Sequence, residues 1–167
     1  ESLGANVTLT GADTDADGEG INFTGTVTGG GNDLTIVGGA GFGDAVSGVG
    51  AVSADTVDSE STIAATSVNV TGVSELGGNV TTTGDQDFGG NVTLTADVEL
   101  DGSTIDVTGN VSGPHNLVLD SNTTDVSGTI GTDIANVTVE TGPLTAGTID
   151  ITGNLDADQN VTTDTGS

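Results

Sequence analysis

Residues 91–100 read Asn-Val-Thr-Leu-Thr-Ala-Asp-Val-Glu-Leu. Apolar residues alternate with polar ones in each half of this stretch, first at Val92 and Leu94 and then at Val98 and Leu100. Alternation with a period of two is the pattern of a β-strand that buries one face. The Gly89-Gly90 pair just before it suits a sharp corner, because glycine tolerates positive φ. The stretch therefore predicts two short strands separated by turns.

The same alternation continues along the chain, with Thr, Asn or Asp between the apolar positions. Glycine-rich corners such as residues 29–31 and 77–78 separate the alternating segments, and no segment has the apolar spacing of a helix. The chain is therefore expected to be all-β. Further alternating pairs are Val7/Leu9, Ile21/Phe23, Leu34/Ile36, Val68/Val70, Ile105/Val107, Leu117/Leu119, Val137/Val139 and Ile149/Ile151.

The alternating segments occur in two matching sets. Residues 1–10, ESLGANVTLT, match residues 86–95, QDFGGNVTLT, at an offset of 85. We therefore expect two repeat copies, residues 1–85 and 86–167, that together form one continuous β-rich module. Other segments match at offsets that drift from 84 to 81: 21–27 with 105–111, 67–72 with 148–153, and 79–82 with 160–163.

The two ends of the chain fall at matching points of this repeat. Gly84-Asp85 is followed by Gln86, whereas its counterpart Gly166-Ser167 would be followed by the counterpart of Gln86, which is Glu1. The sequence thus predicts a unit that continues head to tail, either with copies of itself or with adjoining repeats of a longer chain.

Two all-β architectures are compatible with many short strands in long repeats. In a β-solenoid (parallel β-helix), each inward Val or Ile stacks on its equivalent in the next coil. The alternative is two tandem β-sandwich domains. The chain has three Phe and no Trp, Tyr or Cys, so a sandwich core would lack both large side chains and disulfides. We therefore expect the solenoid.

The charge of the chain is one-sided. It has 25 Asp and Glu residues and no Lys or Arg, which gives a formal net charge of −25. Basic side chains are what neutralise nucleic-acid phosphates and anionic lipid headgroups, and no apolar run is long enough to cross a bilayer. We therefore expect no nucleic-acid partner and no membrane insertion. Divalent cations from solution are the expected partners of such a polyanion.

Residues 80–100, VTTTGDQDFGGNVTLTADVEL, resemble the β-strand repeats of very large bacterial surface proteins, the filamentous-haemagglutinin-like and autotransporter-like adhesins. Residues 33–36 followed by Gly41-Phe42-Gly43 are similar to the same repeats. The resemblance implies an extracellular, cell-surface β-solenoid with structural or adhesive work. Two departures are that the counterpart of Phe42 is Val126 and that Lys and Arg are missing, so the partners of that group are not carried over.

The sharpest local motif is residues 13–20, Asp-Thr-Asp-Ala-Asp-Gly-Glu-Gly. Three Asp at alternate positions followed by Gly are typical of loops that wrap oxygen ligands around Ca²⁺. An EF-hand would need its bidentate Glu where Thr24 stands, and it would need flanking helices, so a simpler loop is expected. Ca²⁺ is the cofactor that the sequence suggests, and its candidate ligands are Asp13, Asp15, Asp17 and Glu19.

The second copy has acids at the corresponding positions, Asp97, Glu99 and Asp101. Because Val98 and Leu100 alternate with them, they form either a weaker Ca²⁺ site or the outward face of a strand. If a solenoid stacks its acids at the strand spacing of about 4.8 Å, some of their pKa values should rise or counter-ions should bind. Other acidic groups, which we interpret as solvated faces, are Asp55/Asp58/Glu60, Asp85/Asp87 and Asp156/Asp158.

Nine Asn residues are followed by x-Ser/Thr, the acceptor sequence for N-glycosylation. The same Asn-x-Thr pattern is also what a repeated turn into a strand looks like here, so both interpretations stay open. The nine are Asn6, Asn22, Asn69, Asn79, Asn91, Asn110, Asn122, Asn136 and Asn160.

Catalysis is not expected. The single histidine, His115, follows Gly113-Pro114 in a predicted turn, without an identifiable nucleophile or carboxylate partner in the sequence. The expected function is a structural repeat module of an extracellular fibre, stalk or adhesin, which stacks head to tail into a filament. The alternative is a Ca²⁺-dependent adhesive module of a cell-surface protein.

Overall fold

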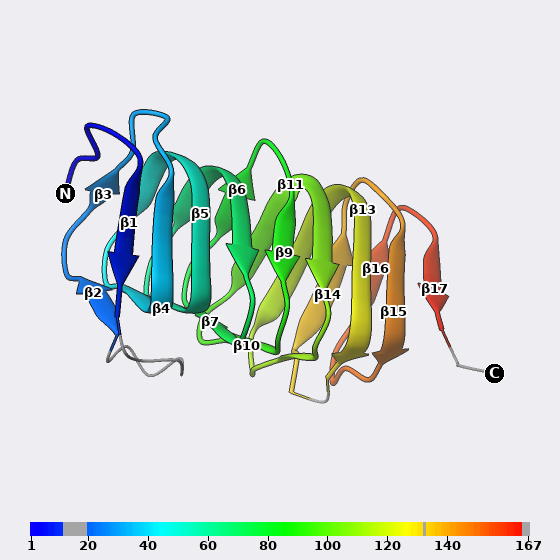
Figure 1. Ribbon diagram of the computed structural model, residues 1–167. Helices are drawn as coiled ribbons and strands as arrows, with labels where there is room; N and C mark the ends of the chain where they lie inside the picture. Colours follow the sequence, from blue (N-terminus) through cyan, green and yellow to red (C-terminus); the bar gives the residue numbers. More distant parts are fainter. Residues whose placement is uncertain (12–19, 132, 165–167) are drawn as a thin grey trace.

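The computed structural model describes residues 1–11, 20–131 and 133–164. In these ranges the chain winds through about 7 stacked coils of a β-solenoid (Figure 1), and every strand pairing is parallel. The predicted solenoid is thereby confirmed, and the alternative of two β-sandwiches is wrong, because sandwiches are built from antiparallel strands. The described residues contain no helix that could span a bilayer.

Seventeen strands lie in the described residues. Several are long because they continue around a corner from one face to the next. In chain order they are β1 (Val7–Thr10), β2 (Ile21–Phe23), β3 (Val27–Thr28), β4 (Leu34–Phe42), β5 (Val46–Ser59), β6 (Ile63–Val70), β7 (Ser74–Leu76), β8 (Val80–Thr82), β9 (Gln86–Phe88), β10 (Val92–Leu94), β11 (Val98–Val107), β12 (Val111–Ser112), β13 (Asn116–Ile130), β14 (Asn136–Val139), β15 (Leu144–Ile149), β16 (Leu155–Ala157) and β17 (Val161–Thr163).

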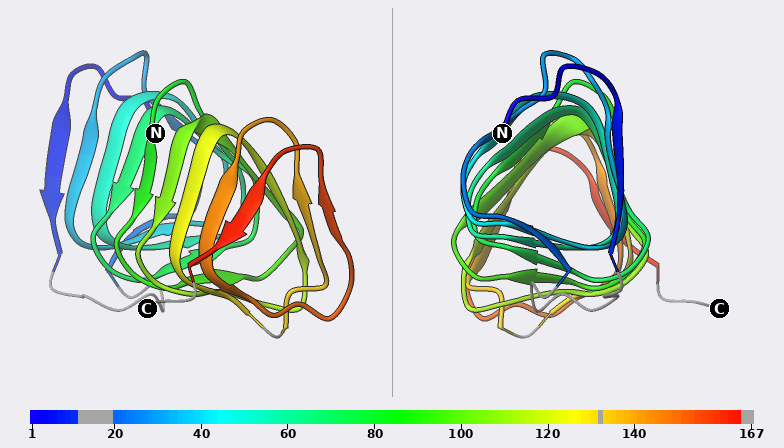
Figure 2. Two further views of the ribbon diagram at one scale, coloured as in Figure 1. Left: turned by 90° about the vertical axis from the view of Figure 1, so that its right-hand side faces the viewer. Right: turned by 60° about the vertical axis from the view of Figure 1, so that its left-hand side comes forward.

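Seen end-on, the coils form a three-sided outline (Figure 2). Face A carries β1, β9, β17 and the segments of β4, β5, β6, β11, β13 and β15 paired in register with them. Face B carries β2, β7, β10, β12 and the ends of β4, β5, β13 and β15. Face C carries β3, β8, β14, β16 and the beginnings of β5, β6, β11 and β13.

One coil is the repeating unit of the structure. Partners in neighbouring coils are 16 to 20 residues apart, as in Val52 with Val68 and Leu117 with Val137, except that Val7 pairs with Leu34 across the first coil. The offset of 85 does not superpose equivalent positions, because Val7 lies on face A and its match, Val92, lies on face B. Pairing crosses residue 85 without a break, since β9 pairs with both β6 and β11. The division into two copies thus remains a prediction about the sequence.

The core consists of small aliphatic side chains stacked in rows along the solenoid axis. On face C one such row is Val46, Ile63, Val80, Leu100 and Leu119, all at most 1% exposed. Burying each of these side chains stabilises the fold by about 1.5–3 kcal/mol. The absence of Trp and Tyr is therefore no obstacle, because every coil supplies the cover for the next.

The corners need residues without side chains. At Gly113 the backbone has a φ of 123°, and a Cβ atom would lie 2.2 Å from the carbonyl oxygen of Leu94. This corner leads into β13, so glycine here lets the chain turn from face B to face C while it touches the coil below.

Candidate functional surface

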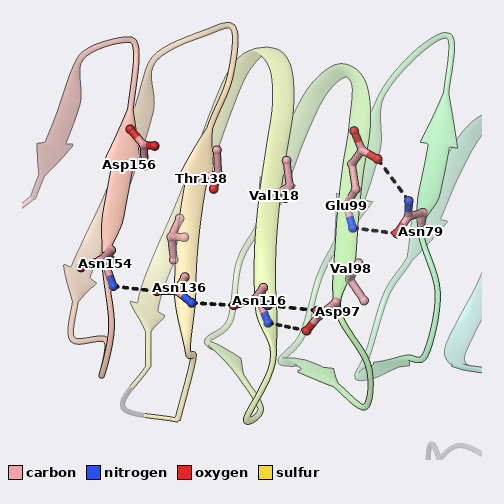
Figure 3. Close-up of a pocket in the computed structure, with 11 residues that line it drawn as sticks. Asn79, Asp97, Val98, Glu99, Asn116, Val118, Asn136, Thr138, Asn154 and Asp156 are labelled. Carbon is pink, nitrogen blue, oxygen red and sulfur yellow. Dashed lines mark hydrogen bonds between the residues drawn. The ribbon is translucent and has the colours of Figure 1, made fainter.

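The largest hollow on the described surface is a groove of about 630 Å³ that runs across four coils of face C. Outward-facing side chains line it, with amides along its middle and carboxylates at its margins (Figure 3). Its main lining residues are Asn79, Asp97, Glu99, Val118, Asn116, Asn136, Thr138, Asn154 and Asp156.

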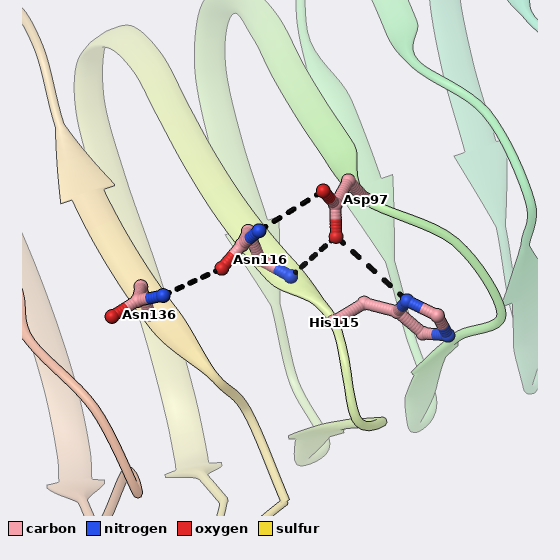
Figure 4. A network of polar contacts seen from close by, with 4 residues as sticks. All are labelled: Asp97, His115, Asn116 and Asn136. Carbon is pink, nitrogen blue, oxygen red and sulfur yellow. Dashed lines mark hydrogen bonds and ion pairs between the residues drawn. The ribbon is translucent and has the colours of Figure 1, made fainter.

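A ladder of hydrogen bonds follows one edge of this groove, from Asp97 through Asn116 and Asn136 to Asn154 (Figures 3 and 4). Asn116 donates its backbone N–H to Asp97 Oδ1 and its side-chain Nδ2 to Asp97 Oδ2, both at 2.9 Å. Asn136 Nδ2 then donates to Asn116 Oδ1 at 2.7 Å, and the backbone N–H of Asn154 donates to Asn136 Oδ1 at 2.9 Å. Because each bond joins consecutive coils, the ladder reinforces the backbone pairing at a corner.

Other corners use the same device. Asn6 Oδ1 accepts the backbone N–H of Asp33, and Asp33 Oδ1 accepts that of Ala51. Elsewhere, Asn110 donates its backbone N–H to Asn91 Oδ1, and Asn110 Oδ1 in turn accepts from Thr129. Short amide or carboxylate side chains at the corners thus satisfy backbone donors that no strand partner reaches.

Removing one link of the ladder should weaken the fold. Asn116→Ala deletes the hydrogen bonds to Asp97 and from Asn136, and it is expected to lower the free energy of unfolding by about 2 kcal/mol. Urea unfolding followed by circular dichroism measures this loss. The matched control is Asn122→Ala, because Asn122 is exposed and its side chain makes no hydrogen bond within the described residues. Equal stability of the two variants would contradict a structural role for the ladder.

Acidic side chains stack in register on the outer surface, as expected for a solenoid. Asp87, Asp106 and Asp125 are successive partners on face A. Partial desolvation, and then the carboxylates of Asp87 and Asp125, raise the pKa of Asp106 above its ordinary value of 3.8. The predicted rise of pKa values in stacked acids is therefore confirmed at this residue. Further in-register acid pairs are Asp101 with Asp120 and Asp58 with Glu75.

Two other carboxylates have their pKa shifted the opposite way. The backbone N–H of Asn116, followed by its side chain, holds the pKa of Asp97 below 3.8. The backbone N–H of Ala45 and then the hydroxyl of Thr26 do the same for Asp44. These two acids are stabilised in the ionised form by hydrogen bonds.

Stability should therefore pass through a maximum in mildly acidic solution. The contribution of Asp106 is fully present below pH 3.8 and is lost as the pH rises through its raised folded-state pKa. The contributions of Asp97 and Asp44 are present above pH 3.8 and are lost as the pH falls through their lowered pKa values. Melting temperatures measured from pH 7 downward should first rise and then fall near and below 3.8. A steady fall from pH 7 would contradict this expectation.

The second predicted Ca²⁺ site is not brought together as a metal cage. Asp97, Glu99 and Asp101 do face outward from one strand, but Asp97 binds Asn116 and Glu99 Oε2 accepts from Asn79 Nδ2 at 3.1 Å. Among the described residues, no group of three or more His, Cys, Asp or Glu side chains is arranged to hold a metal ion. The stronger candidate, Asp13, Asp15, Asp17 and Glu19, lies outside the described residues, so the calcium prediction there is untested.

Several of the predicted glycosylation acceptors serve the corner ladders. The Nδ2 atom, to which a glycan would be attached, donates to Asp33 in Asn6, to Glu99 in Asn79 and to Asn116 in Asn136. Asn91 and Asn110 accept backbone N–H groups. The turn-into-strand interpretation thus describes these five residues, while modification of any sequon stays a prediction.

His115 lies at a corner, as expected, and approaches the ladder. Its Nδ1 atom is 3.7 Å from Asp97 Oδ1 (Figure 4), and the side chain of Asp97 is 67% exposed. An exposed pair of this kind contributes at most about 1 kcal/mol.

Sequence reasoning missed one buried polar residue. Gln86 is fully buried in a row of face A between Val68 and Ile105. Its Nε2 donates to the carbonyl oxygens of Val80 at 2.9 Å and Asp101 at 2.8 Å, which ties together two coils, whereas Oε1 has no partner within the described residues. The signal was present, because Gln86 alternates with Phe88 and so belongs to the inward face.

Comparison of the chain with protein-family models, with curated proteins and with solved structures finds no match. The fold and the surface are therefore interpreted from the geometry of the chain itself.

Proposed function

We propose that this chain is a structural module of an extracellular fibre, stalk or cell-surface adhesin. The observation that supports the proposal most is the continuous parallel ladder, which joins every coil from β1 to β17 without a break. Each added coil lengthens such a rod by about 4.8 Å at constant cross-section. Length and repetition, rather than a reactive site, are what this architecture supplies.

The surface chemistry is consistent with exposure outside the cell. The chain has no Lys or Arg, so trypsin-type proteases find no cleavage site along it. The corner ladders add side-chain hydrogen bonds between coils at positions where local unfolding would otherwise begin.

Immunogold electron microscopy of the source cells, with antibodies raised against the purified chain, tests this proposal. Gold particles are expected on structures that project from the cell surface. Labelling confined to the cell interior would refute the extracellular role.

The calcium-dependent alternative has a separate test. If the acids of residues 13–19 hold Ca²⁺ in the folded state only, the ion must raise the melting temperature, and a chelator must lower it. About 3 kcal/mol of stabilisation is expected when the free ion exceeds its dissociation constant a hundredfold. The double variant Asp15→Asn/Asp17→Asn should abolish the difference. An unchanged melting temperature after chelation would rule out a structural calcium site.

A further inference from the structure

We propose that the C-terminal coil of one copy docks on the N-terminal coil of a second copy, so that faces A, B and C continue across the junction. The inference deepens the fibre role and rests on it. It concerns the two end surfaces of the described solenoid, which carry β16 and β17 at one end and β1 and β2 at the other (Figures 1 and 2).

The C-terminal end surface leaves apolar side chains uncovered. Along one inward row of face C the exposed fraction is 2% at Val98, 1% at Leu117 and 0% at Val137, but 40% at Leu155. The four side chains occupy equivalent positions, so the difference arises because no coil covers Leu155. A coil placed there would bury it as its predecessors are buried.

The N-terminal end surface has the same property. Val7 and Leu9 on face A are only half-buried, whereas their partners in the next coil, Leu34 and Ile36, are at most 2% exposed. On face B, Phe23 is likewise half-buried and stacks on the buried Phe42, with ring centroids 5.4 Å apart. Both end surfaces therefore expose the type of apolar row that is covered everywhere else.

Hydrogen-bonding groups are also left open at both ends. Within the described residues β1 and β2 pair only with β4, β16 pairs only with β14, and β17 pairs only with β15. The corner ladder ends at Asn154, whose side chain has no hydrogen-bond partner within the described residues. Open strand edges of this kind are templates for pairing with another chain.

The distribution of charge favours a second copy in the same orientation. The last coil carries Asp150, Asp156, Asp158 and Asp164, so two such ends would repel each other. Glu1 is the only acid in the described part of the first coil, and the outward side chains of its strands are Thr and Asn. Joining unlike ends brings the acidic surface against the less charged one and keeps the parallel pairing used between all described coils. Such a head-to-tail contact does not close and yields linear rods.

The register of the junction follows from face A. Placing Val7-Thr8-Leu9 of one copy on Val161-Thr162-Thr163 of the other stacks apolar on apolar inside and Thr on Thr outside. This repeats the pattern with which Val7 and Thr8 already pair with Leu34 and Thr35. Thr8 and Thr162 of two copies are therefore adjacent in the proposed filament.

Association of the full chain in 1 M salt, where the Debye length is about 3 Å, tests the surface. Sedimentation velocity should show concentration-dependent linear oligomers. Leu155→Asp is expected to weaken association at least about tenfold, because it buries an unpaired carboxylate in the junction. The matched control Val73→Asp changes a side chain that is 38% exposed but lies in the middle of the rod, and it should associate like the unchanged chain. Monomers at every soluble concentration, or equal association of the two variants, would overturn the proposal.

Cysteine cross-linking tests the register, because the chain contains no Cys. Under mild oxidation, Thr8→Cys/Thr162→Cys should give a ladder of covalent multimers, whereas each single variant should stop at dimers. The control pair Thr93→Cys/Thr162→Cys should not form the ladder, and a ladder of equal yield would overturn the proposed register. Monomeric behaviour together with surface immunogold labelling would refute only the docking, whereas association together with labelling confined to the cell interior would refute only the extracellular role.

Discussion

Raising the salt concentration from 0.01 to 1 M is expected to raise the melting temperature of this chain by roughly 10 °C, because salt screens acids that the fold brings together. Four pairs of acids are in-register partners on neighbouring coils: Asp87–Asp106, Asp106–Asp125, Asp101–Asp120 and Asp58–Glu75. Each repulsion is worth up to about 1 kcal/mol in water of low salt. Unfolding separates the pairs, so their repulsion, about 4 kcal/mol in total, is a cost of folding that 1 M salt largely removes.

Two Asp→Asn substitutions separate this repulsion from general effects of salt. Asp106→Asn removes the centre of the face A stack and should raise the melting temperature in 0.01 M salt, with little effect in 1 M salt. Asp97→Asn makes the same chemical change at a carboxylate that accepts two hydrogen bonds from Asn116, so it should lower the melting temperature at both concentrations. Thermal unfolding followed by circular dichroism measures all three proteins. A melting temperature that does not depend on salt would contradict the electrostatic argument.

The strands and the inward rows could be predicted from the sequence, because both follow from a period of two. The pairs Val92/Leu94 and Leu117/Leu119 are buried inward pairs, as the alternation indicates. The order of the coils could not be predicted in the same way. Corners of different length vary the coil from 16 to 20 residues, so the strongest sequence match, at an offset of 85, joins positions on different faces.

The corner ladder was hidden for the same reason. Asn116, Asn136 and Asn154 are 20 and 18 residues apart, a spacing that carries meaning only when the length of a coil is known. The sequence presented two of these residues as unremarkable polar positions and one as a glycosylation acceptor. Gln86 was hidden differently, because a buried amide contradicts the ordinary rule of apolar interiors unless backbone carbonyls face it.

Leu117→Ala is expected to lower the free energy of unfolding by about 2–5 kcal/mol. Leu117 is 1% exposed and lies between Val98 and Val137 in its row. The deletion leaves a cavity between two coils, and at 2–4 °C for each kcal/mol the melting temperature should fall by about 10 °C. Because each coil contacts only its neighbours, the weakened position should also divide the rod, so that the coils after β13 unfold before those that precede β11. Hydrogen exchange would show this as earlier loss of protection in β14 to β17.

The control is the same substitution three coils along the chain from Val98, at the end of the row. Leu155 is 40% exposed, so Leu155→Ala removes little buried surface and opens no enclosed cavity. Its effect on the free energy of unfolding should stay below about 1 kcal/mol, in the range of surface substitutions. If the two variants lose equal stability, stacking between coils is not what holds the interior of the rod together. If Leu155→Ala is neutral in monomers but destabilising in oligomers, Leu155 is covered only when a second copy is present, as the proposed junction requires.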